Sequence, residues 1–246
     1  MSALVVESVS RSFGGVQALS NVSFSVEPGE RRLIIGPNGA GKTTLFNMLS
    51  GALAVSAGKV TLFGRDITHL PPYERAMMGV ARTFQITNLF AHLTVLENVL
   101  LALQAKDESA FSLHRRMRDN HHLFTAAHAL LESWGLAAIA EHPAKDISYG
   151  EKRQLDLILG MAMRPKVLLL DEPTAGLSAA EVIRVVGLIR SLPGSMTILI
   201  IEHDMDVAFE LADRITVLHQ GRLIAEGDSE AIRHSPQVNE IYLGAE

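Results

Sequence analysis

The sequence predicts an α/β domain with a mainly parallel sheet, an N-terminal antiparallel β portion and an inserted α-helical subdomain. Short apolar runs at residues 31–35, 167–170, 197–201 and 214–218 are typical of strands that are buried on both faces. Helical stretches separate the last three runs, and strands that alternate with helices form parallel sheets. Residues 87–158 contain no convincing strand, so this block is expected to be the helical insertion.

The first elements of the chain are read as strands and turns. Residues 21–26 (NVSFSV) alternate between polar and apolar side chains, and EPGE at 27–30 turns the chain. The run RRLII at 31–35 is a short strand that leads into GPNGAGKTT at 36–44. A helix follows and is expected to end at Gly51, because glycine is common just after a helix C-terminus.

Two further strands and one short helix are predicted outside the helical block. GKVTLFG at 58–64 is a strand with glycine at both ends, and RLIAEG at 222–227 is a strand near the C-terminus. Pro71 and Pro72 begin a short helix, since proline is favoured in a first helical turn.

The block at 87–158 carries helical patterns. Residues 93–105 (LTVLENVLLALQA) are apolar at helical spacing, and Thr94 and Glu97 are placed to form a capping box. Residues 109–124 and 125–134 are predicted to form two further helices.

Composition limits the class of protein. We read the 246 residues as a single domain over 1–246, with an α/β core at 1–86 and 159–246 and a helical subdomain at 87–158. A net charge of −5 argues against a nucleic-acid partner, and the lack of cysteine excludes disulfides and thiolate metal sites. Because we find no signal peptide and no apolar run near the roughly 18 residues of a membrane span, a membrane role would require a partner.

A glycine-rich turn links the strand at 31–35 to a helix. Residues 36–43 (GPNGAGKT) fit the phosphate-loop pattern G-x-x-x-x-G-K-[ST] completely. Glycines let backbone N–H groups approach phosphate oxygens, and a helix N-terminus favours anions. We expect Lys42 to reach the β- and γ-phosphates and Thr43 to bind Mg²⁺. The predicted nucleotide-binding residues here are Gly36, Asn38, Gly39, Ala40, Gly41, Lys42, Thr43 and Thr44.

An acidic pair follows the apolar run VLLL at 167–170. Open α/β sheets bind ligands at the carboxyl ends of their strands. Asp171 is therefore predicted to hold Mg²⁺ through a water, and Glu172 to orient or deprotonate an attacking water. Together with the phosphate loop, this pair predicts a RecA-like phosphate-loop NTPase core.

Further motifs lie in order along the chain. They are RSFGGVQAL around Phe13, ARTFQ ending at Gln85, ISYGE at 147–151, AGLS at 175–178 and IEHD around His203. Their order and rough spacing resemble those of the ABC-type ATPases from end to end. In that family these positions are an adenine-stacking aromatic, the Q-loop glutamine, the signature, the D-loop and the switch histidine. Read alone, an aromatic such as Phe13 is more often a core residue.

The resemblance implies ATP and Mg²⁺ as cofactors and assigns roles to these residues. It implies that Glu172, His203 and Gln85 are catalytic. It also implies that Thr43, Gln85 and Asp171 hold Mg²⁺.

The ISYGE stretch has a local reading and a functional one, and the two are compatible. Ser148 and Glu151 form an S-x-x-E capping box, and a capped helix start is also an anion site. In the ABC family two domains pair head to tail, so Ser148 and Gly150 would meet the γ-phosphate bound to the partner chain. The sequence departs from the usual Leu-Ser-Gly-Gly-Gln at Tyr149 and Glu151, and Ser178 stands where the D-loop often has aspartate.

Several stretches resemble the ATP-binding subunits of branched-chain amino-acid importers, such as GVARTFQ, DEPTAGLSAAE and EHDMDVAFELADRITVLHQGRLIAEG. Importers of amides and urea are similar. The resemblance implies a prokaryotic, peripheral protein on the cytoplasmic face of the membrane, docked to permease subunits that are supplied by a solute-binding protein. The second ATPase chain would be an identical copy or a paralogue.

Other classes of ABC ATPase remain open alternatives. An iron–sulfur assembly ATPase has the same size and is the strongest non-transport alternative. DNA-repair ATPases carry long coiled-coil insertions, whereas the insertion here has about seventy residues and no sustained heptads. Translation-factor ATPases carry two tandem cores, whereas this chain has one. A binding module without turnover would be expected to lack Glu172 or His203, and both are present.

The start of the helical block is unusually apolar. Leu89, Phe90, Leu93, Val95 and Leu96 lie close together in sequence. All of them pack inside the subdomain, or some of them line a groove for a permease loop, because exposed apolar patches mark interaction sites.

Overall fold

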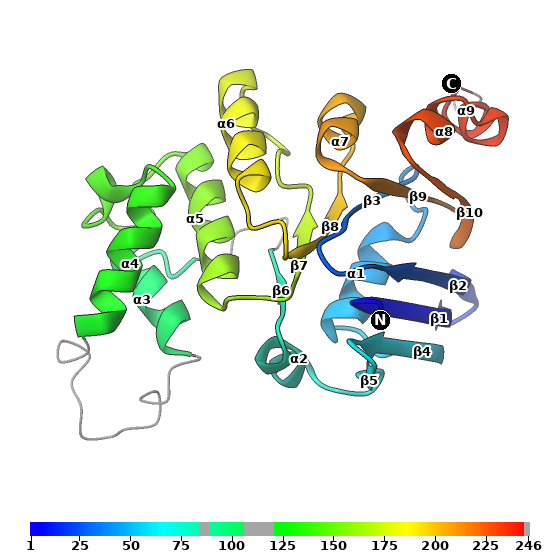
Figure 1. Cartoon of the computed structure of the whole chain (residues 1–246), viewed down its shortest axis with the longest axis horizontal. Coiled ribbons are helices and arrows are strands. Elements are labelled where there is room, and N and C mark those ends of the chain that lie inside the picture. The colour runs from blue at the N-terminus through cyan, green and yellow to red at the C-terminus, as the bar shows by residue number, and fades with distance from the viewer. Residues whose placement is uncertain (84–88, 106–120, 244–246) are drawn as a thin grey trace.

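The computed structural model describes residues 1–83, 89–105 and 121–243 (Figure 1). The strands are β1 (Leu4–Phe13), β2 (Val16–Val26), β3 (Arg31–Ile35), β4 (Ala57–Leu62), β5 (Arg65–Asp66), β6 (Val80–Arg82), β7 (Val167–Asp171), β8 (Thr197–Ile201), β9 (Arg214–His219) and β10 (Arg222–Gly227). The helices are α1 (Lys42–Ser50), α2 (Pro72–Met78), α3 (Val95–Gln104), α4 (His121–Ser133), the 3₁₀ turn η3 (Ala137–Ile139), α5 (Tyr149–Ala162), α6 (Ala179–Arg190), α7 (Met205–Leu211), α8 (Ser229–Arg233) and α9 (Pro236–Leu243).

A mainly parallel sheet forms the centre of the described chain, as predicted. Its strand order is β10-β9-β3-β8-β7-β6. Strand β3 pairs in parallel with β8 and β9, β7 pairs in parallel with β8 and β6, and β10 runs antiparallel to β9. Every residue of β7 and of β8 is buried, which agrees with their apolar runs. Because β3, β8 and β7 are neighbours, the segments after their carboxyl ends meet at one edge of the sheet.

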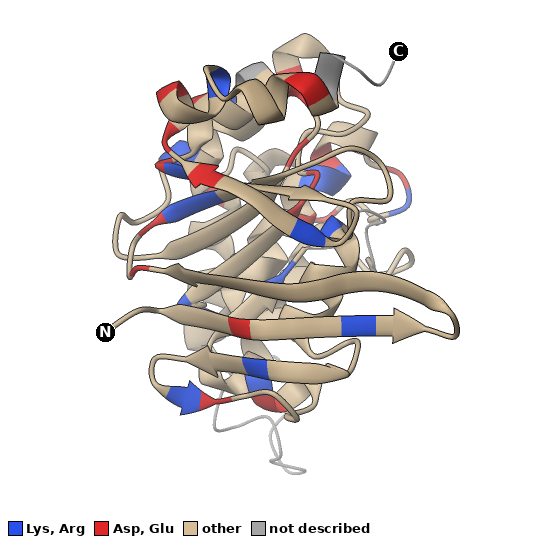
Figure 2. Cartoon of the chain, turned by 90° about the vertical axis from the view of Figure 1, so that its right-hand side faces the viewer, with Lys and Arg blue, Asp and Glu red and all other residues tan. Residues whose placement is uncertain are grey.

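The N-terminal β portion is antiparallel, as predicted. It forms a sheet of order β2-β1-β4-β5, seen on the near side in Figure 2, where charges of both signs are interspersed. The predicted strand at 21–26 is the end of the longer β2. Its partner β1 was not predicted separately. Ser8 lies in β1 with a positive φ of 51°, and register shifts interrupt the β1–β2 pairing, so the alternation of side chains breaks down there.

The helical block contains α3, α4 and the start of α5, which lie side by side (Figure 1). The predicted capping box of α3 is present, since Thr94 Oγ1 accepts from the Glu97 N–H and the Thr94 N–H donates to the Glu97 carboxylate. The predicted break between residues 124 and 125 was wrong, because α4 runs continuously from His121 to Ser133. Alanines and leucines between residues 126 and 131 are good helix formers and continue the helix beyond the predicted boundary.

Helix α5 crosses residue 158, where the helical block was predicted to end. A single apolar cluster also joins the helical block to one face of the parallel sheet, with Leu131, Ile158 and Leu168 among its members. The division into a core and a subdomain at residue 158 therefore stays a prediction.

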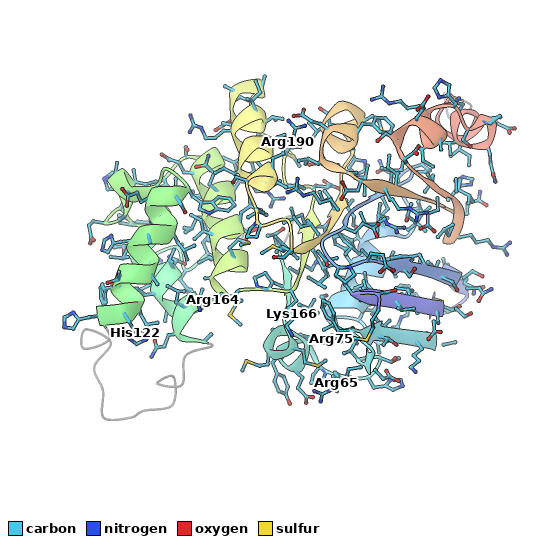
Figure 3. The ribbon with its side chains drawn as sticks, viewed as in Figure 1. Arg65, Arg75, His122, Arg164, Lys166 and Arg190 are labelled. Carbon is cyan, nitrogen blue, oxygen red and sulfur yellow. The ribbon has the colours of Figure 1, made fainter. Side chains whose placement is uncertain are left out.

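A buried arginine fastens helix α2 to the end of α1. Arg75 is 1% exposed and is labelled in Figure 3. Its guanidinium donates to the carbonyl oxygens of Met48 (2.6 Å) and Leu49 (2.9 Å) in the last turn of α1, and also to those of Leu70 and Thr68. Burial lowers the pKa of this guanidinium. The arginine thus adds donors at the end of α1, where intrahelical N–H groups run out, and the Met48 carbonyl also accepts from the Gly51 N–H.

Replacing this arginine is expected to cost stability. Arg75→Met removes the four donated bonds and leaves buried carbonyl oxygens without partners, so the free energy of unfolding should fall by about 2–4 kcal/mol. Urea unfolding measures this change in the free energy of unfolding. Tyr73→Phe, at a side chain of the same helix that is 69% exposed, is the control and should change stability by under about 0.5 kcal/mol. Equal effects of the two variants would contradict the bracing role of Arg75.

Candidate active site

The phosphate loop connects β3 to α1, as predicted from its pattern. Gly36 and Gly41 have φ values of 154° and 103°. A Cβ atom on Gly36 would lie 2.1 Å from the Leu218 carbonyl oxygen, and one on Gly41 would lie 2.6 Å from the Leu19 side chain. No other residue type fits these two positions without displacing its neighbours. The glycines therefore let the loop curl tightly over the end of the sheet.

Lys42 begins α1 and lies under this loop. Its ammonium donates to the carbonyl oxygens of Gly36 (2.6 Å) and Pro37 (3.1 Å). Burial lowers the pKa of Lys42, and the negative charges of Glu172 and Asp171 act in the opposite direction. The lysine is thus a buried cation that is held between the phosphate loop and the acidic pair.

A cavity of about 200 Å³ lies over the phosphate loop. Its walls bring together loop residues and the two residues that follow β7 and β8. The lining residues are Ala18, Asn38, Gly39, Ala40, Gly41, Lys42, Thr43, Thr44, Glu172 and His203. The structure therefore gathers most of the predicted nucleotide-binding residues with two of the predicted catalytic residues around one space. Ala18, which precedes the loop in sequence, was not predicted.

Glu172 and His203 form a hydrogen-bonded pair at this cavity. The Glu172 Oε1 atom lies 2.7 Å from His203 Nε2. Glu172 has a left-handed backbone with a φ of 48°, which is uncommon for a residue other than glycine, and its N–H donates to the Ile201 carbonyl. Backbone strain of this kind is concentrated at functional sites. The chain leaves β7 sharply and turns the Glu172 carboxylate toward the histidine that follows β8.

Asp171, the other member of the acidic pair, is buried at the end of β7. Its Oδ2 atom accepts a hydrogen bond of 2.7 Å from Arg82, which also donates to Asn47 Oδ1. Asp171 is not among the cavity-lining residues, and its carboxylate is already paired with Arg82. Sequence reasoning missed Arg82, because the ion pair joins two strands that are far apart in sequence.

A buried carboxylate behind the histidine was also missed. Glu202 is 4% exposed, and its Oε1 atom accepts from the N–H and the hydroxyl of Thr174 at 3.0 and 2.7 Å. Its Oε2 atom accepts from the His203 N–H at 3.1 Å. Burial raises the pKa of Glu202. The available signal was its place directly after the apolar run TILII, which matches the place of Asp171 after VLLL.

The ISYGE stretch begins helix α5 through the predicted capping box. The Ser148 N–H donates to the Glu151 carboxylate at 2.7 Å, and Ser148 Oγ accepts from the Glu151 N–H at 3.3 Å. Gly150 is packed against α6, since a Cβ atom there would lie 2.1 Å from the Glu181 carboxylate. Ser148 and Gly150 are not among the described residues that line the phosphate-loop cavity. The local reading of this motif is thus confirmed.

Phe13 lies at the end of β1 and is 47% exposed, so the core reading of this residue was wrong. The Arg11 guanidinium stacks over its ring, 4.9 Å from the centroid.

Gln85, the predicted Q-loop glutamine, lies outside the described residues. The apolar start of the helical block divides: Val95 and Leu96 are core residues, whereas Phe90 is 62% exposed.

Phe13 gives a prediction on nucleotide choice. A ring face without a hydrogen-bonding group stacks on any base and contributes about 1–3 kcal/mol. Phe13→Ala is therefore expected to raise the Kd for ATP and for GTP by a similar factor, roughly tenfold, as measured by calorimetry. Val16→Ala, at the residue paired with Phe13 and 70% exposed, is the control and should leave both affinities unchanged. Equal affinities in the Phe13 variant and the wild type would show that the base stacks elsewhere.

Comparison with known proteins agrees with this geometry. Residues 19–175 match the family model described as ABC transporter. The chain is 40% identical to the high-affinity branched-chain amino acid transport ATP-binding protein LivG of Salmonella typhimurium, over 98% of this chain and 97% of that protein. It is 38% identical to the corresponding protein BraF of Pseudomonas aeruginosa, again over 98% and 97% of the two chains.

Solved structures agree as well. A nucleotide-free ATP-binding cassette from an ABC transporter superposes with a TM-score of 0.87 and 32% identity, over 98% of this chain and 99% of that one. A dimeric ATP-binding cassette bound to ADP and phosphate has a TM-score of 0.79 and 26% identity, over 92% and 98%. Within the described residues, no helix is both long and apolar enough to span a bilayer. With the family model, full-length relatives and the phosphate-loop site in agreement, the chain belongs to the ABC transporter family.

Proposed function

We propose that this chain is the ATP-hydrolysing subunit of an importer for branched-chain amino acids. One observation carries the hydrolysis: Glu172 and His203 are hydrogen-bonded at 2.7 Å in the wall of the cavity that the phosphate loop lines. The substrate class is supported by relatives that are named for branched-chain amino acid transport and align over nearly the full length of both chains.

The residues of the cavity suit phosphoryl transfer to water. Loop N–H groups and the Lys42 ammonium stabilise negative charge on the β- and γ-phosphates. Glu172 accepts a proton from the attacking water, and His203 holds its carboxylate in place. Phosphoryl transfer gives the protein little covalent chemistry to perform, so positioning and charge stabilisation account for most of the rate.

Mg²⁺ suits the oxygen donors of Thr43, at the start of α1, and of Asp171, at the end of β7. The Thr43 hydroxyl, the Asp171 carboxylate and the Gln85 amide would hold it, since oxygen ligands are those that Mg²⁺ prefers. When bound, the ion neutralises charge on the β- and γ-phosphate oxygens. Arg82 already neutralises part of the Asp171 charge, so this carboxylate alone is a weaker magnesium ligand than an isolated one.

The site needs a second ATPase chain to close it. Ser148 and Gly150 lie outside the cavity, at the N-terminus of α5, where the helix end favours an anion. The Ser148 oxygen accepts the Glu151 N–H, and its hydroxyl can still donate to such an anion. We propose that two such chains, identical or paralogous, pair head to tail, so that this helix start meets the γ-phosphate held by the partner. Tyr149, 50% exposed at the same helix start, would lie at that interface.

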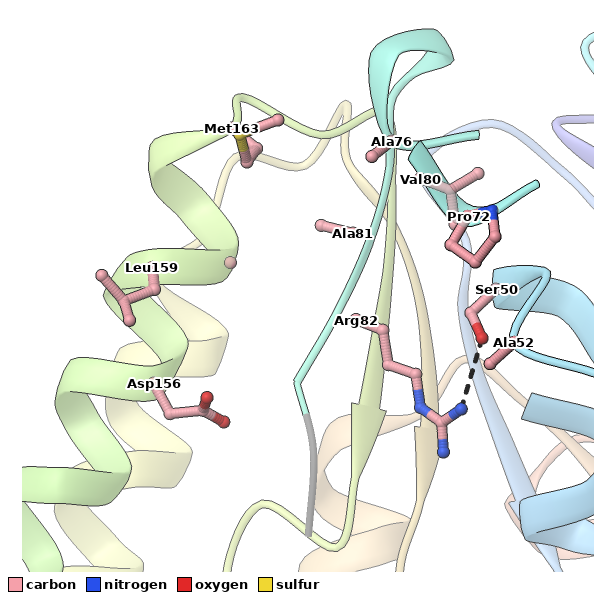
Figure 4. Close-up of a pocket in the computed structure, with 11 residues that line it drawn as sticks. Ser50, Ala52, Pro72, Ala76, Val80, Ala81, Arg82, Asp156, Leu159 and Met163 are labelled. Carbon is pink, nitrogen blue, oxygen red and sulfur yellow. Dashed lines mark hydrogen bonds between the residues drawn. The ribbon is translucent and has the colours of Figure 1, made fainter. Parts of the chain in front are cut away.

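A groove beside the active site suits a membrane permease loop. A hollow of about 420 Å³ lies between α2, β6 and α5 and is lined mainly by small and apolar residues, with Arg82 and Asp156 as its charged members (Figure 4). Arg82 reaches from this groove to Ser50 Oγ and to Asp171. A permease loop in the groove would therefore lie close to the residues that respond to nucleotide. In such a complex the chain is peripheral, on the cytoplasmic face of the membrane.

Co-purification tests the transport assignment. The tagged chain, extracted from its native membranes in mild detergent, is expected to retain a polytopic membrane protein and a second ABC ATPase, identified by mass spectrometry. Recovery of a soluble scaffold protein of cofactor assembly in place of a membrane protein would contradict the assignment.

A further inference from the structure

A buried arginine on α5 donates hydrogen bonds to the backbone segment that carries Glu172. Arg153 is 1% exposed. Its Nη2 atom donates to the carbonyl oxygens of Asp171 (2.6 Å) and Glu172 (2.5 Å), and its Nε atom donates to that of Pro173 (3.0 Å). Asp156, one turn along α5, lies 3.7 Å from its Nη1 atom and offsets the charge. One planar guanidinium thus donates hydrogen bonds to three consecutive backbone carbonyls.

These are the carbonyls at which the chain leaves the sheet. Asp171 is the last residue of β7, and Glu172 adopts its left-handed φ of 48° immediately afterwards. A non-glycine residue keeps such a conformation only where its surroundings enforce it. The Glu172 N–H is held by Ile201, and the Glu172 carbonyl is held by Arg153, so the peptide groups on both sides of this residue are fixed.

Helix α5 is bonded to the same segment at its start. The Tyr149 hydroxyl donates to the Ala175 carbonyl at 3.2 Å, and Gly150 packs against Glu181 of α6. The helix that begins with the ISYGE stretch is therefore attached to residues 171–181 from its first turn to Arg153. A change in the position of this helix would move the Glu172 backbone with it.

We propose that Arg153 is a positioning residue for hydrolysis, which holds the Glu172 backbone in the left-handed conformation that directs the carboxylate into the phosphate-loop cavity. This inference rests on the ATP hydrolysis proposed above. Arg153 is not among the residues that line the cavity, and its hydrogen bonds to this segment go to backbone carbonyls, so its effect on hydrolysis passes through the position of Glu172. Lysine cannot replace it fully, because an ammonium lacks the planar fork that reaches three carbonyls in one plane.

The first test separates catalysis from binding and from stability. Arg153→Met is expected to lower kcat about 10²-fold, the effect of a misplaced catalytic group, and to change the Kd for ATP less than about twofold. Arg75→Met is the matched control, since that arginine is equally buried and also donates to backbone carbonyls, but lies away from the cavity. Both variants are assayed at a temperature at which circular dichroism shows them folded, and Arg75→Met should keep its kcat.

A double-mutant cycle asks whether Arg153 acts through Glu172. If it does, Arg153→Met added to Glu172→Gln should lower the single-turnover rate no further, because the positioned carboxylate is already absent. If Arg153→Met only disturbs the structure, the rate losses of Arg153→Met and Glu172→Gln should multiply in the double variant. Either a multiplied loss or a wild-type kcat in Arg153→Met would overturn the proposal.

Arg153→Lys provides the test if Arg153→Met does not fold. It keeps the charge, and we expect it to lower kcat roughly tenfold with the Kd for ATP unchanged. A wild-type kcat in this variant would also overturn the proposal. Failure of the underlying function would look different: the wild type and Glu172→Gln would then hydrolyse ATP at the same rate.

Discussion

Glu172→Gln is expected to lower ATP hydrolysis roughly 10²–10⁴-fold while ATP still binds, the range for loss of a general base. The amide keeps the shape of the carboxylate but does not accept the proton of the attacking water. Loss of its charge beside the γ-phosphate site should also let an ATP-bound dimer persist. Phosphate release measures the rate, and size-exclusion chromatography with ATP measures the dimer.

The control for this variant is Glu97→Gln. Glu97 closes the capping box of α3 and is not among the described residues at the cavity, and glutamine serves that cap equally well. Its hydrolysis rate should stay within about twofold of the wild type. Turnover near that of the wild type in Glu172→Gln, with Mg²⁺ present, would refute the role of Glu172.

Phe90→Asp is expected to abolish assembly with the permease, and transport with it. The Phe90 side chain is 62% exposed, while its backbone is fixed to Asn98, whose amide bonds both the Phe90 N–H (2.9 Å) and carbonyl (3.2 Å). A charge there leaves the fold intact but would have to be buried without a partner in the apolar contact, which is costly. Solute uptake by cells and recovery of the permease with the tagged chain measure the effect.

Ile183→Asp is the matched control for this surface. Ile183 is 74% exposed on α6 and, unlike Phe90, does not belong to the apolar start of the helical block, so this variant should assemble and transport normally. If Phe90→Asp instead unfolds the chain, with parallel loss of ATP binding, then Phe90 supports the fold and the docking surface lies elsewhere. Normal assembly of a folded Phe90→Asp would move the docking surface elsewhere.

Sequence patterns predicted the parts of this protein that are determined by residues close together in the sequence. The buried runs at 31–35 and 167–170 are strands, and the phosphate loop lies between strand and helix, because periodicity and glycine geometry are local properties. The capping boxes at Thr94 and Ser148 were predicted for the same reason.

The parts that sequence reasoning missed are long-range. Arg82, Arg153 and Glu202 each bond partners that are distant in the chain. Nothing in the spacing of an isolated arginine or glutamate tells which carbonyl or carboxylate the fold will place against it. The continuous helix α4 was divided wrongly before Thr125, because threonine often begins a helix, whereas here its hydroxyl donates to the His121 carbonyl inside the helix.

Reconstituted uptake shows whether ATP hydrolysis at Glu172 drives the import of a branched-chain amino acid. The purified chain, its co-purified permease and its solute-binding protein are placed in liposomes with ATP on the side of the ATPase, and entry of radiolabelled leucine is followed. We expect ATP-dependent leucine accumulation with the wild type and none with Glu172→Gln. Accumulation that is equal in the two preparations, or uptake of urea or an amide in place of leucine, would contradict it.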